Sequence, residues 1–228
     1  MKVFDTIGQF DEILKRGVNY AVFDVDNTIT KSNIAQFYFF IKRKRLKNTL
    51  YWWPFLLYCA SAAPFYLILD LISRDWFNHL FVQRKFRKYT YEQLEIYAEM
   101  FFHESLKQQF ISPIHDLIFY LKSKGVQITL LSTNFDLLVK QYGSYFEVPY
   151  VCLSVIKTDN GIRIDFSKLS GFKHNSIQHF DPALTMAVGD SKYDLPMLEH
   201  VHYPIIVAKK KKKWMQSLQR EALLIRHS

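Results

Sequence analysis

Short apolar runs that end in a polar side chain constrain the fold of this chain more than any other feature. Residues 20–24 read YAVFD, residues 126–132 read VQITLLS, and residues 185–190 read TMAVGD. Each run is long enough for a buried strand, and each places a carboxyl or hydroxyl group at its carboxyl end. A fourth run, PIIVA at residues 204–208, is equally apolar. The sequence therefore predicts four buried strands.

Helical signals lie between these runs. The Ser-Pro pair at residues 112–113 is typical of a helix start, and Gly125 is typical of a helix end. Asn134 is predicted to cap a further helix. Residues 151–157 and 162–166, joined by Asp-Asn-Gly, predict a hairpin. Strands that alternate with helices indicate an α/β fold with a Rossmann-like parallel sheet and helices on both faces.

One long segment interrupts this alternation. Residues 31–111 are rich in aromatic residues and contain no clear strand. We predict that residues 1–30 and 112–228 form the core, and that residues 31–111 form an inserted helical cap over the strand ends. At 228 residues, of which 49% are apolar, the chain is long enough for a core with one insert.

Charge and cysteine usage narrow the partners and the compartment. The formal net charge of +9 favours anionic partners such as phosphate esters, acidic lipids or nucleic acid, although basic residues also simply solvate a surface. The two cysteines, Cys59 and Cys152, lack metal-site spacing and are predicted to be buried, reduced thiols. The amino-terminal residues do not resemble a secretory signal peptide. We therefore expect a cytoplasmic protein.

The first polar strand end reads DVDNT at residues 24–28. Asp24 ends the strand, and the following turn brings Asp26 back towards the same space. One carboxylate can then attack phosphorus while the other transfers a proton to the leaving oxygen and later accepts one from water. A plain turn with capping residues is the alternative interpretation.

The third strand end reads GDSKYD at residues 189–194. Asp190 and Asp194 lie four residues apart across a turn, which suits a hard cation bound through oxygen. Magnesium needs only one or two protein carboxylates, because it keeps several waters and also binds substrate phosphate. The alternative is a solvated, capped helix start.

Two further elements suit phosphate chemistry. Ser132, Thr133 and Asn134 follow the second strand, where a hydroxyl group and backbone N–H groups can bind phosphate oxygens. Lys173 lies upstream of the third strand, and a cation is needed because a carboxylate that attacks a phosphate dianion is repelled by it. An ordinary surface lysine is the alternative for Lys173.

The order DVDNT, LLSTN, a lone lysine and GDSKYD resembles the four-motif signature of the haloacid dehalogenase superfamily. The arrangement is similar to the phosphoserine-phosphatase-like branch, in which a cap follows the first motif. The resemblance covers residues 18–30 and 112–208. It implies a magnesium-dependent phosphatase, because an acid at position 26 favours phosphatases over dehalogenases and over the phosphate-transfer pumps of the superfamily.

The resemblance also implies a role for each motif residue. Asp24 would be the nucleophile that becomes phosphorylated, and Asp26 the general acid and base. Ser132 would bind the phosphoryl group, and Lys173 would bridge it to the nucleophile. Magnesium would be held by four groups: the carboxylates of Asp24, Asp190 and Asp194 and the backbone carbonyl of Asp26.

Two positions depart from the pattern of phosphoserine phosphatases. Those enzymes usually carry asparagine just before the last motif aspartate, where this chain has Tyr193. They also carry glutamate nine residues after the nucleophile, where this chain has Asn33. Both departures count against phosphoserine as the substrate and leave the phosphoryl-transfer residues unaffected.

Residues 50–69 form an uncharged stretch near the length needed to cross a bilayer. Basic residues at 42–47 precede the stretch, and Lys209–Lys213 repeat the basic character near the carboxyl terminus. Pro54 and Pro64 predict a kinked pair or a re-entrant segment rather than one straight helix. A helix hairpin whose apolar residues are buried in the cap is the alternative.

An apolar cap in this position resembles that of the class C phosphatidylglycerophosphatases, which implies a phospholipid headgroup phosphate as substrate. Three hypotheses follow. The leading one is a phosphomonoesterase at an anionic membrane surface on the cytoplasmic side. The others are a soluble, phosphoserine-like small-molecule phosphatase and a non-catalytic protein that binds anionic surfaces. The four aspartates argue against the last, and nucleic acid is not an expected partner.

Overall fold

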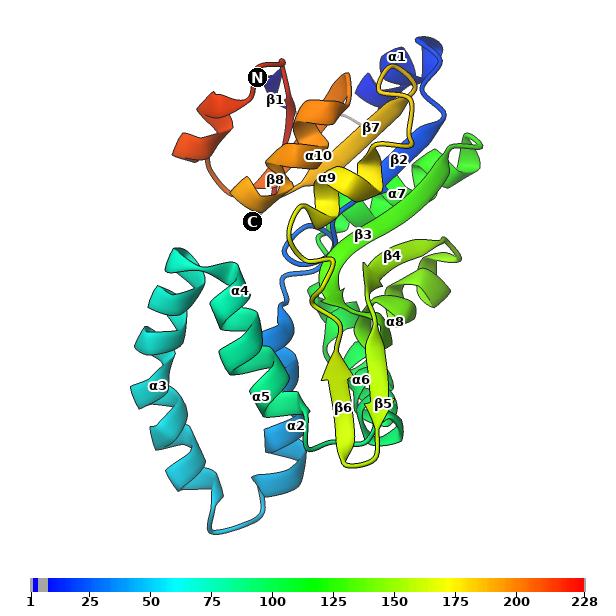
Figure 1. Ribbon diagram of the computed structural model, residues 1–228. Helices are drawn as coiled ribbons and strands as arrows, with labels where there is room; N and C mark the ends of the chain where they lie inside the picture. Colours follow the sequence, from blue (N-terminus) through cyan, green and yellow to red (C-terminus); the bar gives the residue numbers. More distant parts are fainter. Residues whose placement is uncertain (1, 4–7, 228) are drawn as a thin grey trace.

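The computed structural model of the chain describes residues 2–3 and 8–227 (Figure 1). Within these residues, seven strands form one sheet in the order β1-β9-β8-β7-β2-β3-β4, and every neighbouring pair is parallel. The strands are β1 (Lys2–Val3), β2 (Tyr20–Phe23), β3 (Gln127–Phe135), β4 (Tyr150–Leu153), β7 (Thr185–Gly189), β8 (Tyr203–Ala208) and β9 (Leu223–Arg226). The predicted Rossmann-like α/β fold is confirmed.

Strand β2 pairs with β3 on one side and with β7 on the other. Phe23 lies opposite Leu130 of β3 and Val188 of β7, so the three strands end at the same edge of the sheet. Ala21, Val22 and Phe23 are all buried, because helices cover both faces of the sheet. This register places the polar residues that follow each strand side by side.

The helices of the core are α1 (Gln9–Lys15), α7 (Ser112–Ser123), α8 (Asp136–Phe146), α9 (Phe172–Ile177) and α10 (Leu195–His200), with short 3-10 turns η3 (Lys192–Asp194) and η4 (Lys213–Ser217). Helix α7 begins at the predicted Ser-Pro pair. The chain leaves that helix through Gly125 at φ +77°, a conformation that favours glycine.

Two local predictions are wrong. Asn134 does not cap a helix: β3 continues through Phe135, and the Asn134 side chain accepts a hydrogen bond from the Phe135 N–H. The predicted strand at 151–157 is two strands. Residues 150–153 pair with β3 as β4, while β5 (Val155–Thr158) forms the hairpin with β6 (Gly161–Ile164). The run at 151–157 is divided because its first part pairs with β3 at the edge of the sheet. The sequence pattern alone does not reveal this pairing.

The segment between β2 and α7 is helical, as predicted. It contains α2 (Ile34–Leu46), α3 (Trp52–Ile72), α4 (Arg74–Phe77), the π-helical turn η1 (Asn78–Gln83), α5 (Arg84–Phe86), α6 (Tyr91–Glu104) and the 3-10 turn η2 (Leu106–Gln109). Buried aromatic rings join this segment to the core. Phe37 of α2 packs against Phe86, Phe101 and the core residue Phe135, with ring centroids 5.4 to 6.0 Å apart.

Helix α3 runs along the outside of the cap (Figure 1). It is one continuous helix with Pro64 inside it, so the expected break is absent: a proline removes a single backbone hydrogen bond, and the turns on both sides persist. It is long and apolar enough to cross a membrane, with a mean hydropathy of 1.8. Leu69 is its one buried residue, so a hairpin packed inside the cap is not what this stretch forms.

The two cysteines carry free thiols, as expected, but neither is fully buried. Cys152 lies in β4, the strand that pairs with β3, and burial raises the pKa of its thiol to about 12. Cys59 lies on α3, where burial also raises the pKa of the thiol. The prediction of buried thiols is therefore wrong in degree, because each side chain is only partly buried.

Candidate active site

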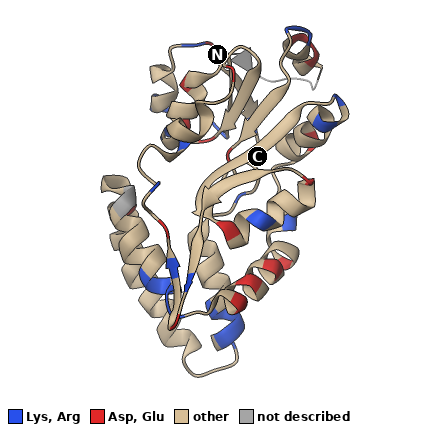
Figure 2. Ribbon diagram, turned by 45° about the vertical axis from the view of Figure 1, so that its right-hand side comes forward, with Lys and Arg blue, Asp and Glu red and all other residues tan. Residues whose placement is uncertain are grey.

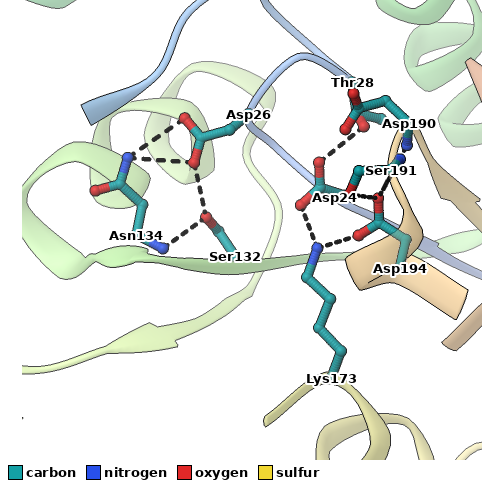
Figure 3. Close-up of polar contacts among 9 residues, drawn as sticks. All are labelled: Asp24, Asp26, Thr28, Ser132, Asn134, Lys173, Asp190, Ser191 and Asp194. Atoms are coloured by element: carbon teal, nitrogen blue, oxygen red, sulfur yellow. Dashed lines mark hydrogen bonds and ion pairs between the residues drawn. The ribbon is translucent and has the colours of Figure 1, made fainter. Parts of the chain in front are cut away.

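Asp24 lies directly after β2, where its N–H donates to the Val188 carbonyl at 2.9 Å. Its carboxylate is 5% exposed and has two buried partners. The Thr28 hydroxyl donates to Oδ2 at 2.8 Å, and Lys173 Nζ lies 2.5 Å from Oδ1 (Figure 3). The turn that returns Thr28 to Asp24 passes through Asn27 at φ +59°, a conformation that asparagine tolerates. Both carboxylate oxygens are thus held in a fixed orientation.

Lys173, in the first turn of α9, is 7% exposed and bridges two carboxylates. It forms ion pairs with Asp24 and with Asp194. Burial disfavours the ammonium, but the carboxylates of Asp194 and Asp24 outweigh it and raise the pKa of Lys173 above its ordinary value. The alternative of an ordinary surface lysine is wrong, because the fold brings α9 against the end of β2.

Asp194 is the most tightly held carboxylate of the site. Its Oδ2 accepts hydrogen bonds from the backbone N–H groups of Asp190 and Ser191, at 3.0 and 2.9 Å, and from the Ser191 hydroxyl at 2.9 Å. Its Oδ1 contacts Lys173. Gly189 permits this packing, because a Cβ atom there would lie 2.6 Å from the Asp194 Cβ. Asp194 therefore organises the turn and the lysine at once.

The Asp190 carboxylate lies close to the carboxylates of Asp24 and Asp194. Burial is the main cause that raises the pKa of Asp190 to about 7, and the Asp194 carboxylate adds to it. Burial also raises the pKa of Asp24 well above its ordinary value, against the effect of Lys173. The cluster holds more negative charge than its own cation balances.

The cluster fits a divalent cation. One carboxylate oxygen from each of Asp24, Asp190 and Asp194 lies within 4.8 Å of the others. Three carboxylates and the Lys173 ammonium leave a net formal charge of −2. Hard oxygen donors and this charge suit magnesium, whose remaining positions are filled by water and substrate oxygens. Since both Asp194 oxygens already accept hydrogen bonds, Asp190 is the better candidate for direct ligation.

The remaining predicted residues form a second group on the other side of Asp24. Asn134 Nδ2 lies 3.3 Å from both carboxylate oxygens of Asp26, and the Ser132 hydroxyl lies 3.4 Å from one of them (Figure 3). Ser132 Oγ also accepts from the Asn134 N–H at 3.0 Å. The Asp26 side chain therefore points towards β3 and away from the Lys173 cluster.

A cavity of about 770 Å³ connects these groups with the cap. Its core side includes Asp24, Asp26, Thr133, Asn134, Lys173 and Asp190. Its cap side is apolar and aromatic for the most part, with contributions from α2, α3, η1 and α5. Of the predicted residues, Ser132 and Asp194 are fully buried and are not among the residues that line the cavity.

The family model of haloacid dehalogenase-like hydrolases matches residues 21–199, most of the chain and all four motifs. This chain is a haloacid dehalogenase-like hydrolase. No curated protein sequence gives a significant match to this hydrolase. Its structure is similar to a phosphoserine phosphohydrolase-like protein from Francisella tularensis, with a TM-score of 0.62 and 15% identity over 90% of this chain and 94% of that one.

Two other solved structures have the same fold as the hydrolase. One is a protein of unknown function from Bordetella pertussis, with a TM-score of 0.61 and 16% identity over 90% of this chain and 98% of that one. The other is a phosphoserine phosphatase in apo form, with a TM-score of 0.55 and 14% identity over 91% and 93% of the two chains. At such identities the similarity establishes the fold of the hydrolase.

The two departures from the phosphoserine-phosphatase pattern have structural roles in this hydrolase. Asn33 caps α2: its Oδ1 accepts from the N–H groups of Ala35 and Gln36 at 3.0 and 3.2 Å. The Tyr193 hydroxyl donates to the Asp70 carbonyl of α3 at 3.2 Å, which joins the core to the cap. Both side chains line the cavity.

Sequence reasoning missed three contacts of the site in the hydrolase. Thr28 and Ser191 lie inside the two acidic motifs, so their hydroxyl groups were available as a signal, and each binds a carboxylate of its own motif. Lys212, in the basic run near the carboxyl terminus, donates to the Asp190 carbonyl at 3.2 Å. No local pattern indicates that contact, because the strand β8 alone brings Lys212 to this end of the sheet.

Proposed function

We propose that this hydrolase is a magnesium-dependent phosphomonoesterase that forms a phosphorylated Asp24 during turnover. The observation that carries the proposal is the buried Asp24 carboxylate, paired with Lys173 and surrounded by two further acids at the end of a cavity. A nucleophilic carboxylate needs a fixed orientation, and a phosphate dianion needs compensating positive charge. The phosphatase names of similar structures point in the same direction.

The residues divide the chemistry between them. An Asp24 oxygen attacks phosphorus as the ester P–O bond breaks, and Asp26 gives its proton to the leaving oxygen. Asp26 then takes a proton from water, whose oxygen attacks the phosphorylated Asp24 and releases inorganic phosphate. Lys173 lowers the repulsion between carboxylate and phosphate. Magnesium would be held by Asp24, Asp190, Asp194 and the Asp26 carbonyl. It would add positive charge where the Asp24 carboxylate approaches the phosphate dianion.

The groups of β3 would hold the phosphoryl oxygens. Thr133 and Asn134 line the cavity, and Ser132 joins them through its hydroxyl group. The hydrogen bonds from Ser132 and Asn134 to Asp26 also keep that carboxyl group on the leaving-group side. In the presence of substrate, Asn134 would share its donor between Asp26 and the phosphoryl oxygens, while the buried Ser132 hydroxyl group would act through its contacts with Asn134 and Asp26.

The substrate is proposed to be a lipid phosphate at an anionic membrane surface on the cytoplasmic side. Three features support this: the mostly apolar cap side of the cavity, the exposed outer face of α3, and the basic residues Arg43, Lys44 and Arg45 in the last turn of α2. Figure 2 shows Lys and Arg at the lower end of the cap, where α2 ends, next to ribbon that carries almost no charge. Such a surface suits a headgroup layer with acidic lipids.

A soluble, phosphoserine-like phosphatase is the second candidate. The names of similar structures favour it, and Asp70 supplies one carboxylate to the cavity wall. The cap role of Asn33 disfavours it, since the amide oxygen is already engaged at the start of α2. We expect free phosphoserine to be hydrolysed poorly. A specificity constant for phosphoserine far above that for every other ester would reverse this ranking.

The experiment is a phosphate-release assay with an aryl phosphate, in magnesium and in chelator. We expect activity that chelation abolishes and magnesium restores. Beryllium fluoride with magnesium should inhibit the enzyme by mimicking a phosphorylated Asp24. Activity in full chelator would contradict the proposal. An absence of hydrolysis for every ester, with liposome binding intact, would instead support the non-catalytic, surface-binding hypothesis.

A further inference from the structure

The cavity extends far from Asp24 along one face of α3. Tyr58, Ala62, Tyr66 and Asp70 all line it, and their spacing of four residues places them on the same side of the helix. At a rise of ~1.5 Å per residue, this face is about 18 Å long. The contact between Tyr193 and the Asp70 carbonyl fixes the Asp70 end beside the catalytic turn. The Tyr58 end is therefore the distal one.

The opposite wall runs antiparallel to α3. Phe77 lies near the catalytic end, Phe81 and Val82 follow in η1, and Lys85 lies at the distal end. The walls are mostly apolar and aromatic, with Asp70 at one end and Lys85 at the other, and the small side chains of Cys59, Ala62 and Ala63 leave the space between them open. This space belongs to the same cavity as Asp24 and Lys173. We call it the α3 channel.

Side chains close the distal end of the α3 channel. Lys85 Nζ donates to the Tyr58 hydroxyl at 2.6 Å and so bridges α5 and α3 across the channel. The same ammonium lies 4.7 Å from the centre of the Tyr58 ring and 5.8 Å from the centres of the Tyr38 and Tyr66 rings, so the bridge also reaches back towards Tyr66. Beyond this bridge, the rings of Phe39, Trp52 and Phe55 pack together, with centroids 5.7 to 6.0 Å apart.

We propose that the α3 channel binds the apolar chain of the substrate. This inference rests on the proposed phosphatase function. With the phosphate at Asp24, the chain runs along Tyr66, Ala62 and Cys59 and stops at the Tyr58–Lys85 bridge. The channel thus sets an upper limit of about 18 Å on the chain that it encloses. The occupant is part of the substrate, because the channel leads from the reacting groups.

The first experiment is a series of linear alkyl phosphates of rising chain length, assayed below micelle-forming concentrations. The specificity constant kcat/KM should rise about fourfold with each methylene buried in the channel, and then level off or fall when the chain reaches the bridge. Tyr58→Ala should move this limit to longer chains. A kcat/KM that ignores chain length would overturn the inference.

Ala62→Phe tests the position of the chain. It should lower the ratio of kcat/KM for a long alkyl phosphate over that for an aryl phosphate by about a hundredfold, because the ring would occupy the channel. The matched control is Ala60→Phe, on the exposed side of the same helix and outside the cavity lining. We expect that control to keep the ratio within about twofold. Equal effects of the two variants would contradict the inference.

Cys59 gives a readout that needs no turnover. A long-chain alkyl phosphonate, which cannot be hydrolysed, should slow alkylation of Cys59 in the channel and leave Cys152 unaffected. Equal rates with and without the phosphonate would overturn the inference even if Ala62→Phe failed to fold. Wild-type protein that is active on aryl phosphates but indifferent to chain length refutes the channel alone. Wild-type protein without activity on any ester refutes the proposed function.

Discussion

The catalytic turns and helix α3 are opposite kinds of structure in one chain. At the strand ends, Asp24, Lys173 and Asp194 are buried and bind one another through short polar contacts. In α3, Trp53 and Leu57 are 73% and 74% exposed, and Leu69 is the one buried residue. The first region is rich in charge and fixed by many partners. The second is almost uncharged and has few.

This difference assigns separate tasks to the two regions. Groups that react must be held in one orientation, and Asp24, Asp26 and Asp194 each have two or more partners. A wall that receives an apolar chain and faces a lipid surface needs area rather than fixed geometry. Changes in the first region should therefore alter the reaction itself, whereas changes in the second should alter which substrates and surfaces are reached.

The largest effect is expected for Asp24→Asn. The amide cannot form the phosphorylated intermediate, so phosphate release should fall by at least about a thousandfold. Far-ultraviolet circular dichroism should remain that of the wild type, because the amide is close in size and still meets Thr28. The matched control, Asp159→Asn in the exposed hairpin turn, should keep full activity. Near-normal turnover by Asp24→Asn would refute the division of tasks.

Asp190→Ala and Asp194→Ala should separate metal binding from stability within the catalytic region. Asp190→Ala should lose the response to magnesium more severely, because Asp190 is the candidate for direct ligation. Asp194→Ala should be less stable in chelator by roughly 2–4 kcal/mol, since it leaves Lys173 and three buried donors with fewer partners. Magnesium titration of activity and urea unfolding of both variants measure this. The reverse order in either assay would contradict the roles.

The outer face of α3 tests the second region. The wild type should bind anionic liposomes and stay bound in high salt, because apolar burial is not screened. Trp52 and Phe55 pack against Phe39. The variant that tests the outer face therefore replaces the exposed Trp53 and Leu57 with serine. Binding should weaken by about tenfold or more, and activity on a lipid phosphate should fall more than activity on an aryl phosphate.

A replacement of Trp52 and Phe55 serves as the comparison for that test, because it disturbs the inner aromatic contacts and leaves Trp53 in place. If the wild type remains monodisperse without detergent and ignores liposomes, the membrane proposal fails. The α3 channel would then serve a soluble substrate.

The smallest effect concerns pH in metal-free protein. Asp190 has a pKa of about 7 in the folded state and a lower one when unfolded, so the folded state binds its proton more tightly. Stability should therefore be greatest near pH 4 and decline as pH rises towards about 7, by roughly 1–3 kcal/mol at most. Urea unfolding in chelator measures it. Asp190→Asn should flatten the decline, and a rise in stability over this range would contradict it.

Local sequence patterns were enough to predict the parallel sheet and to identify the acidic motifs. Runs such as residues 20–24 and 185–190 combine a local apolar pattern with a polar end, and both the pattern and its spacing are written in neighbouring residues. Because parallel strands end at one edge, Asp24 and Asp190 had to meet there. The helical cap followed in the same way, from a long segment without strand pattern.

Which side chains are in contact and which are exposed depends on how distant segments pack together. Lys173 is far from Asp24 in sequence, and its burial depends on the packing of α9 against β3. Asp26 turns to Asn134 because β3 runs beyond its predicted end. The apolar sequence of α3 likewise does not predict that the helix is exposed, since the same residues would suit a buried helix. Local patterns fix conformation along the chain, whereas contact and burial arise from surfaces that meet across it.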